Sequence, residues 1–266
     1  MKSIHLILSI VVALLTGACD AQQDPYYGNS EVKIPQIDPD WNLKLIPNRS
    51  GQYWKVFVYK DLKYNALFTR SLGWNGGDGV FTTGLPDGNI FWSFNDSFYG
   101  VVNENRSRGN CSFPRNSIMV QTNDPNADRY YQVRTHIRHP KATLSEDKIQ
   151  AGEIDQDYLY WAGDATIYNN QMQMLWGAVD NTDENNLMRR FGTCLVTYSL
   201  EGKPGDDTYM KLISRNDDFN DHTLGYGDTM WEDEDGHTYL YTTSNYKVAV
   251  ARTATHDLSS QWEYYV

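Results

Sequence analysis

Positive charge is scarce in this chain of 266 residues. Lysine and arginine number 23 against 34 aspartates and glutamates, which gives a formal net charge of -11 at pH 7. The basic residues form no run that stands out. A protein with this balance is not expected to attract partners that are themselves negative. The composition therefore argues against direct binding to nucleic acid or to an anionic membrane surface.

Long hydrophobic runs and helical periodicity are also lacking. An apolar run near the N-terminus, Leu6–Leu15, is too short to cross a bilayer. Because Lys2 precedes it and small residues follow, the run has the layout of a signal peptide. Elsewhere the apolar residues do not recur at helical spacing, and aromatic residues reach 14%. Both features favour many short strands and an all-β fold.

The end of the apolar run, LTGAC (15–19), resembles a bacterial lipobox, the motif in which the cysteine becomes the lipidated first residue. Thr16 stands where that motif usually has leucine. We expect a signal peptide over 1–19, lipidation at Cys19 and a polar tether over 20–50. The mature protein would then be exported and lipid-anchored in the bacterial cell envelope. An ordinary cleaved signal is the alternative.

Cysteine is scarce too, with three in the chain. After export, Cys111 and Cys194 would lie in an oxidising compartment where they could pair. Cys194 lies within the apolar run Cys194–Val196, so a buried free thiol is at least as well supported.

Several familiar site motifs are absent from the sequence. There is no serine or cysteine nucleophile motif, no phosphate-binding loop and no dinucleotide fingerprint. His136 and His139 have no evident ligand partners and are predicted to lie in a solvated loop. We therefore expect no cofactor and no metal site. A calcium ion on the central axis of the fold is the alternative.

The stretch 74–100 holds a hairpin signal. Two runs with strand character, Val80–Thr83 and Ile90–Phe94, flank a turn that contains Asp87 and Gly88. In a hairpin centred there, residue 78 faces roughly residue 97. Asp78 and Asp96 should therefore lie side by side at the open end, as a candidate pair of catalytic carboxylates.

This pattern recurs along the chain. A Gly-Asp pair, a strand, a polar turn and a second strand begin near residues 78, 164 and 228, and each hairpin is followed by two further strand-like runs. A repeated unit of four antiparallel strands is typical of a β-propeller blade. The segment Gly51–Arg70 carries another strand pair. We therefore predict a partial propeller over 51–266, with about three blades in a chain that stops part-way round the ring.

With three blades in view, the chain resembles a known propeller superfamily. The resemblance rests on GWNGGDG (73–79), LPDGNIFWSFNDSFYG (85–100), GNCSFPRNS (109–117) and YKVAVARTATHDLSSQWEYY (246–265). These segments are similar to the five-bladed propellers that include arabinanases, xylosidases and related furanosidases, and most of all to an uncharacterised exported lipoprotein branch of them. The resemblance implies an oligo- or polysaccharide partner and a funnel at the propeller axis.

In these hydrolases, carboxylates lie near the starts of the innermost strands, which implies Asp78, Asp164 and Asp228 here. A related group uses an aspartate pair placed like Asp78 and Asp96, so we expect Asp78 as nucleophile or general base and Asp96 as the partner acid. The alternative is that these aspartates only cap backbone groups in turns. The furanosidase branch also uses a glutamate acid, and the nearest candidates, Glu153 and Glu232, do not fit that position.

Five further residues are candidates for binding the sugar. Arg115 could hold a sugar hydroxyl or pair with Asp96, and Asn116 stands beside it. Three aromatic residues precede the Gly-Asp pairs and could stack on sugar rings or pack between blades: Trp74, Trp161 and Tyr226.

The first hypothesis is thus a glycoside hydrolase with paired carboxylates. A non-catalytic glycan-binding lipoprotein that uses the same funnel, and a propeller scaffold for protein partners, are the alternatives.

Overall fold

The computed structural model describes residues 44–47, 53–56, 68, 70–123, 130–134, 137–145, 148, 157–183, 185, 188–219, 224–244 and 247–265. The expected signal peptide with Cys19, most of the tether, His136 and Glu153 lie outside these residues. In the part of the chain that is described, no helix has the length and apolar character needed to cross a membrane.

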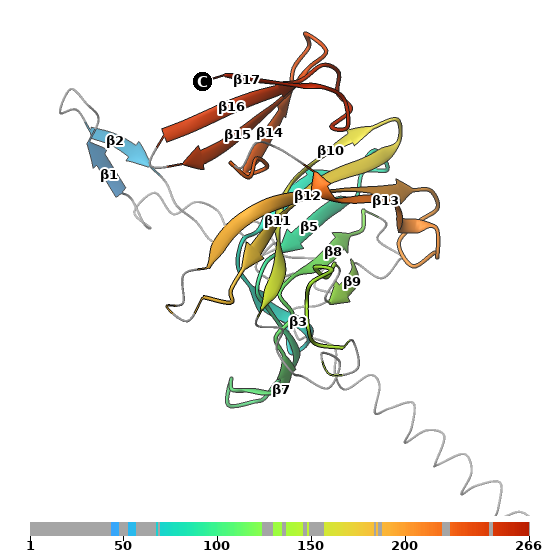
Figure 1. The fold of residues 1–266 in the computed structure, drawn as a ribbon. Coiled ribbons are helices and arrows are strands. Elements are labelled where there is room, and N and C mark those ends of the chain that lie inside the picture. Colours follow the sequence, from blue (N-terminus) through green and yellow to red (C-terminus); the bar gives the residue numbers. More distant parts are fainter. Residues whose placement is uncertain are drawn as a thin grey trace, which may run out of the picture.

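The protein is built of antiparallel strands, which confirms the all-β prediction (Figure 1). Three sheets contain four strands each, and within each sheet the strands lie in chain order. Sheet 1 consists of β4 (Phe81–Gly84), β5 (Ile90–Phe94), β8 (Ser117–Gln121) and β9 (Tyr130–Arg134). Sheet 2 consists of β10 (Tyr158–Tyr168), β11 (Gln171–Asp180), β12 (Arg189–Leu200) and β13 (Tyr209–Phe219). Sheet 3 consists of β14 (Thr229–Glu232), β15 (Thr238–Ser244), β16 (Lys247–Thr253) and β17 (Trp262–Tyr265).

The predicted turns join the first two strands of each sheet. Gly88 has φ +82° and Gly236 has φ +89°, conformations that glycine adopts without strain. Between β10 and β11, Asn169 and Asn170 both have positive φ, as a tight two-residue hairpin requires. Local turn chemistry thus accounts for the agreement between the sequence repeat and the three sheets.

The prediction was wrong about how the second unit starts. Asp164 does not open a strand, because β10 begins at Tyr158 and runs through it. The pairing of β10 with β11 shifts register between Ala162 and Ala165, so Asp164 lies in a β-bulge.

A three-stranded sheet was not foreseen. It contains β3 (Leu72–Gly77), β6 (Ser97–Val102) and β7 (Arg108–Ser112). In the chain, β3 precedes sheet 1, and β6 and β7 come between its strands β5 and β8. A Cβ on Gly100 would lie 2.3 Å from the Asn110 carbonyl oxygen, so β6 and β7 approach closely only because Gly100 has no side chain. Glycine weakens the usual strand signal, which is why this sheet is hard to read from the sequence.

A two-stranded sheet pairs β1 (Lys44–Pro47) with β2 (Tyr53–Val56). β2 lies within the segment 51–70, where a strand pair was expected. Its partner β1 lies in the segment 20–50 that was expected to be a tether.

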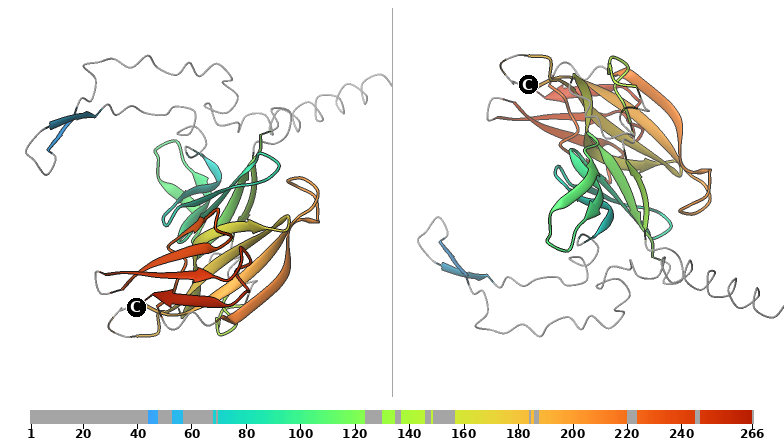
Figure 2. Two further views of the ribbon diagram at one scale, coloured as in Figure 1. Left: turned by 90° about the horizontal axis from the view of Figure 1, so that it is seen from above. Right: turned by 90° about the horizontal axis from the view of Figure 1, so that it is seen from below.

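Sheet 2 is drawn between sheet 3 and sheet 1 in Figure 1, and Figure 2 shows the same sheets from above and from below. The first strand of sheet 2, β10, contacts β4 and β5 on one side and β14 on the other. Apolar residues of β11 are therefore buried on both faces, including Met174, Leu175 and Trp176. One core cluster joins sheets 1 and 2, and another joins sheets 2 and 3.

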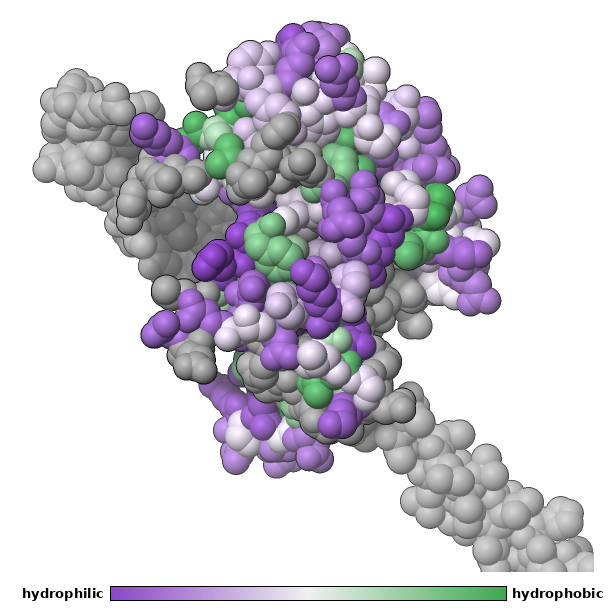
Figure 3. Space-filling view, in the orientation of Figure 1, coloured by the Kyte–Doolittle hydropathy of each residue, from purple (hydrophilic) through white to green (hydrophobic). Residues whose placement is uncertain are grey.

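Apolar residues on the outer surface are dispersed. On the face shown in Figure 3 they form small groups among hydrophilic residues. Such scattered residues are normal for a folded protein and do not define one large apolar docking surface there.

Candidate functional site

The backbones of Asp78 and Asp96 lie side by side, as the hairpin predicted. The register of β4 and β5 pairs Phe81 with Ser93, and beyond the strands it continues to the two aspartates. The Asp78 N–H donates to the Asp96 carbonyl oxygen at 3.1 Å, and the Asn95 N–H donates to the Asp78 carbonyl oxygen at 2.9 Å. Two carboxyl groups are thus carried by adjacent, hydrogen-bonded backbone.

The glycines around Asp78 are explained by close packing. A Cβ on Gly79 would lie 2.0 Å from the Asn95 amide nitrogen, and Gly79 has φ +55°. A Cβ on Gly77 would lie 2.9 Å from the Ser97 hydroxyl. The space that glycine leaves beside Asp78 is therefore filled by the turn from β5 to β6, which holds Asp78 in place.

Asp96 is held at both carboxylate oxygens. Arg115 Nη1 donates to Oδ2 at 2.9 Å, and the Trp161 indole N–H donates to Oδ1 at 3.2 Å. The ion pair is largely covered, with side-chain exposures of 10% for Arg115 and 19% for Asp96. Charge-assisted hydrogen bonds of this kind fix both the position and the orientation of a carboxylate. Arg115 thus takes the role of ion-pair partner that the sequence left open.

Asp78 lies in a different environment. Partial burial raises the pKa of its carboxyl group above the ordinary value, and the nearby charge of Asp96 raises it further. Two adjacent carboxyl groups whose surroundings differ in this way are suited to divide the roles of acid and base.

Trp161 and Asn95 connect this pair to sheet 2. Trp161 belongs to β10 and bonds Asp96, while Asn95 Oδ1 accepts a hydrogen bond from the Ala162 N–H at 2.6 Å. The Trp161 side chain remains partly exposed. Asn95 carried no recognised signal in the sequence, because its role depends on contact with a strand 67 residues away.

Asp164 and Asp228 cap backbone and side-chain groups. Asp164 Oδ1 accepts from the Ala165 N–H at 2.9 Å, and its Oδ2 accepts from the Met230 N–H at 2.7 Å, so it ties sheet 2 to sheet 3. Burial raises the pKa of Asp164 despite these donors.

Asp228 forms an ion pair with Arg190 at 3.0 Å. Its Oδ2 accepts from Thr242 Oγ1 at 3.1 Å and from the Thr243 N–H at 3.2 Å. These contacts give the aspartates of the second and third Gly-Asp pairs a structural role, which accounts for their recurrence.

Two of the three aromatic candidates lie in the core. Trp74 is 5% exposed and packs against Phe94 with ring centroids 4.4 Å apart. Tyr226 is fully covered and packs against Trp262 and Tyr264. Core packing was the alternative that the sequence left open for these rings, and among the three only Trp161 is accessible.

Asn116 is also structural. Its Nδ2 donates to the Ile137 carbonyl oxygen at 2.8 Å and to the Tyr160 carbonyl oxygen at 3.0 Å, and its Oδ1 accepts from the Ile137 N–H at 3.1 Å. With these bonds made, the buried amide is committed to joining sheets 1 and 2.

A family model described as a domain of unknown function, DUF5005, matches residues 61–266. The chain belongs to this family. No curated protein matches the DUF5005 chain.

Among solved structures, the DUF5005 chain is similar to one from Bacteroides ovatus ATCC 8483 that is described as a "putative hydrolase". The identity is 87%, the TM-score is 0.74, and the match covers 90% of this chain. The chain spans 63% of the length of that relative. A weaker match is the GH43 BlXynB protein from Bacillus licheniformis, with 13% identity, a TM-score of 0.33, and coverage of 73% of this chain and 32% of the other. This second likeness is too low to carry an argument.

The two cysteines in the described part of the DUF5005 chain are unpaired. Cys194 is fully buried, as its apolar run predicted. Among the described residues, no group of three or more histidine, cysteine, aspartate and glutamate side chains is placed to hold a metal ion.

Two further side chains are placed by the structure. Glu232 accepts hydrogen bonds from the Thr166 hydroxyl and the Ile167 N–H, in the part of β10 beyond its bulge and away from Trp161.

His139 is 7% exposed, so the prediction of a solvated position was wrong. It packs among Tyr158, Tyr160 and Phe191, rings that the sequence does not place near one another.

Proposed function

We propose that this chain is part of an exported, lipid-anchored glycoside hydrolase that cleaves an oligo- or polysaccharide, with Asp78 and Asp96 as its catalytic carboxyl groups. The carrying observation is that Arg115 and Trp161 hold both oxygens of Asp96 beside Asp78. Support also comes from the relative of 87% identity that is described as a "putative hydrolase". Export and anchoring rest on the lipobox-like segment that ends at Cys19.

The two environments favour particular roles. Arg115 donates to Asp96 within an ion pair, which orients this carboxylate for the role of base or nucleophile. The pKa of Asp78 is raised, so it retains a proton more readily and suits a general acid. We therefore assign the acid to Asp78 and the base or nucleophile to Asp96, which reverses the roles that the resemblance implied.

The sugar would bind against Trp161. Its ring is partly exposed while its N–H bonds Asp96, so a sugar that stacks on the ring is brought next to the carboxylate. A substrate held in this position reacts faster, because binding has already brought the reacting groups together in the right orientation.

The proposed architecture is a β-propeller in which sheets 1, 2 and 3 are consecutive blades. Each sheet is a four-stranded antiparallel meander. The first strand of sheet 2, β10, contacts the first strands of sheets 1 and 3, β4 and β14. Neighbouring first strands are expected of blades whose innermost strands surround an axis. Asp96 and Trp161 would then lie between the first two blades, near that axis.

The test is hydrolysis by the full-length protein and by the variants Asp78→Asn and Asp96→Asn, on a panel of arabinans, xylans and other polysaccharides. Asp207→Asn is the matched control, since Asp207 is exposed. Loss of a general acid or base should lower the rate by about 10²–10⁴-fold, and the control should keep it.

If either variant hydrolyses as fast as the wild type, the pair is not catalytic. Glycan binding without turnover on any substrate would instead support the alternative function, a non-catalytic glycan-binding lipoprotein.

A further inference from the structure

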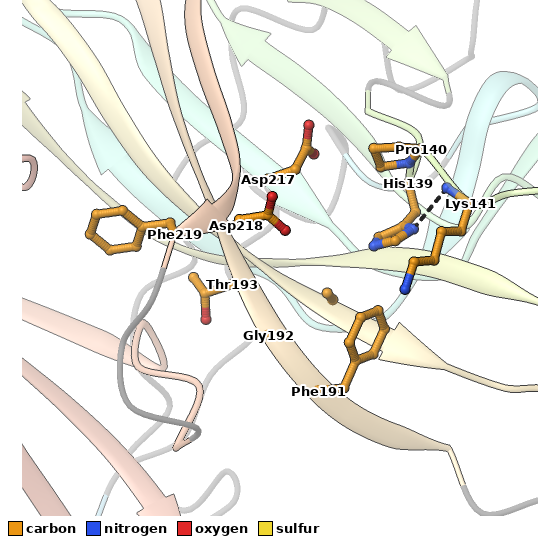
Figure 4. Close-up of a pocket in the computed structure, with 10 residues that line it drawn as sticks. His139, Pro140, Lys141, Phe191, Gly192, Thr193, Asp217, Asp218 and Phe219 are labelled. Atoms are coloured by element: carbon orange, nitrogen blue, oxygen red, sulfur yellow. Dashed lines mark hydrogen bonds between the residues drawn. The ribbon is translucent and has the colours of Figure 1, made fainter.

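A pocket with a volume of about 520 Å³ lies between the segment that follows β9 and the ends of β11, β12 and β13 (Figure 4). This volume lies within the range of roughly 300–1,000 Å³ that is usual for small-ligand sites. The pocket is separate from the pair of Asp78 and Asp96, neither of which lines it. The residues that define its chemistry are His139, Lys141, Phe191, Gly192, Asp217 and Asp218.

One wall presents a histidine in a defined state. The Lys141 backbone N–H donates to His139 Nδ1 at 3.1 Å, so Nδ1 is an acceptor and the proton of the neutral ring is on Nε2. Burial lowers the pKa of His139, which favours that neutral ring. In Figure 4 the other ring nitrogen points into the pocket, toward the side where Asp218 stands. His139 therefore offers one fixed hydrogen-bond donor to a ligand.

The opposite wall presents two acidic side chains. Asp217 is held in place, because Arg215 Nε donates to both its oxygens, at 2.7 and 2.9 Å, and the Tyr160 hydroxyl donates to Oδ1 at 2.7 Å. Asp218 is exposed, and in Figure 4 its carboxylate faces His139 across the pocket. Within the described chain the Asp218 carboxylate has no hydrogen-bond partner. It is therefore an acceptor that a ligand hydroxyl could use.

Aromatic surface lines the same space. Phe191 is 42% exposed and lines the pocket. Its centroid lies 5.3 Å from that of His139, so the two rings form one apolar wall beside the polar groups. Lys141 Nζ lies 5.7 Å from the Phe191 centroid, at the rim of the pocket.

Both signs of charge face the pocket. Lys141, Asp217 and Asp218 line it, Arg215 pairs with Asp217, and burial favours the neutral form of His139. A phosphate or sulfate would meet two carboxylates, so the pocket favours a ligand without charge. An uncharged ligand with many hydroxyls matches the donor, the acceptors and the aromatic wall together. We propose that this pocket binds a neutral saccharide, at a second site that is distinct from the proposed catalytic pair and does not depend on catalysis.

Gly192 provides a way to close the pocket without disturbing the fold. It pairs with Ala178 across β11 and β12, so the two residues face the same side of the sheet. A Cβ on Gly192 would meet only the Ala178 Cβ, at 3.9 Å, which is ordinary contact. Gly192→Ala therefore fits, whereas the branched side chain of Gly192→Val projects into the pocket from a strand position that suits valine.

The experiment is a glycan array that carries neutral, sulfated and uronic-acid oligosaccharides, probed with the full-length protein and followed by calorimetry on each neutral array member that binds. We expect neutral members to bind and charged members to bind more weakly. Gly192→Val and Asp218→Asn should each weaken binding by about tenfold or more, as expected when a ligand is blocked or loses a hydrogen bond to a charged group. Gly192→Ala is the matched control and should bind as the wild type does.

The outcomes separate this pocket from the proposed catalytic pair. Binding that survives in Asp78→Asn and Asp96→Asn but is lost in Gly192→Val supports the pocket, whether or not the protein hydrolyses anything. The proposal is overturned if no neutral member binds, if charged members bind best, or if Gly192→Val binds as tightly as Gly192→Ala.

Discussion

Replacement of Asn116 by alanine should destabilise the junction between sheets 1 and 2. The side chain is 1% exposed and makes three hydrogen bonds, of 2.8, 3.0 and 3.1 Å, to backbone groups of Ile137 and Tyr160. These backbone groups belong to the segment between β9 and β10 and to β10 itself. The amide is therefore a link between consecutive sheets rather than a local turn.

The magnitude follows from the bonds that are lost. Three hydrogen bonds with a net contribution of about 1 kcal/mol each amount to about 3 kcal/mol, and backbone groups left unsatisfied away from water add to this loss. Ile137 and Tyr160 are both buried, so water does not readily replace the amide. At roughly 2–4 °C per kcal/mol for a domain of this size, the midpoint of thermal unfolding should fall by about 6–12 °C.

Urea and thermal unfolding of the wild type and of Asn116→Ala measure this loss. Asn123→Ala is the matched control, because Asn123 is exposed and surface substitutions usually change stability by less than about 0.5 kcal/mol. Asn116→Asp is a second variant. It keeps the oxygen that accepts from the Ile137 N–H, but it replaces the donating Nδ2 by an oxygen that faces two carbonyl oxygens, so it should also destabilise the protein. A loss in Asn116→Ala no larger than in the control would refute the reasoning.

Two further predictions concern titration and reactivity. Because burial raises the pKa of the Asp78 carboxyl group in the folded protein, the wild type should lose stability as the pH rises from the unfolded pKa, about 3.9, through the folded pKa. Asp78→Asn lacks this titration, so its unfolding midpoint should rise relative to that of the wild type over this window and change no further above it. A difference that is independent of pH would contradict this. Burial raises the pKa of Cys194 to about 12, while Cys111 is partly exposed. A thiol reagent should therefore modify Cys111 in the native protein and Cys194 only after unfolding. Timed labelling followed by mass spectrometry checks this.

The hairpin of Asp78 and Asp96 shows what local sequence can predict. Turn residues and strand runs are close together in the chain, so the register follows from the turn, and the expected pairing of residue 78 with residue 97 differs by one residue from the observed pairing with Asp96. The partners of Asp96 could be foreseen only in part. Arg115 was a candidate because it stands nearby, whereas the Trp161 contact requires the packing of sheet 2 on sheet 1.

His139 and Asp164 show where the sequence misleads. A histidine in a polar loop suggests solvent, but sheet 2 brings Tyr158, Tyr160 and Phe191 around the ring. Asp164 shares the Gly-Asp signal of the other units, yet its carboxylate bonds the first strand of the next sheet. In both cases the partner is distant in the chain, so composition and spacing carry no information about it.

Local sequence signals suffice to predict the all-β class, the three four-stranded units and the neighbouring positions of Asp78 and Asp96, because turn chemistry and strand periodicity act over a few residues. Which side chains are available for chemistry depends instead on how the sheets pack. Packing of consecutive sheets buries Trp74 and Tyr226, commits Asn116 and Asp164 to backbone groups, and leaves Trp161 beside Asp96. Burial and long-range contact thus turn one repeated motif into a single candidate site.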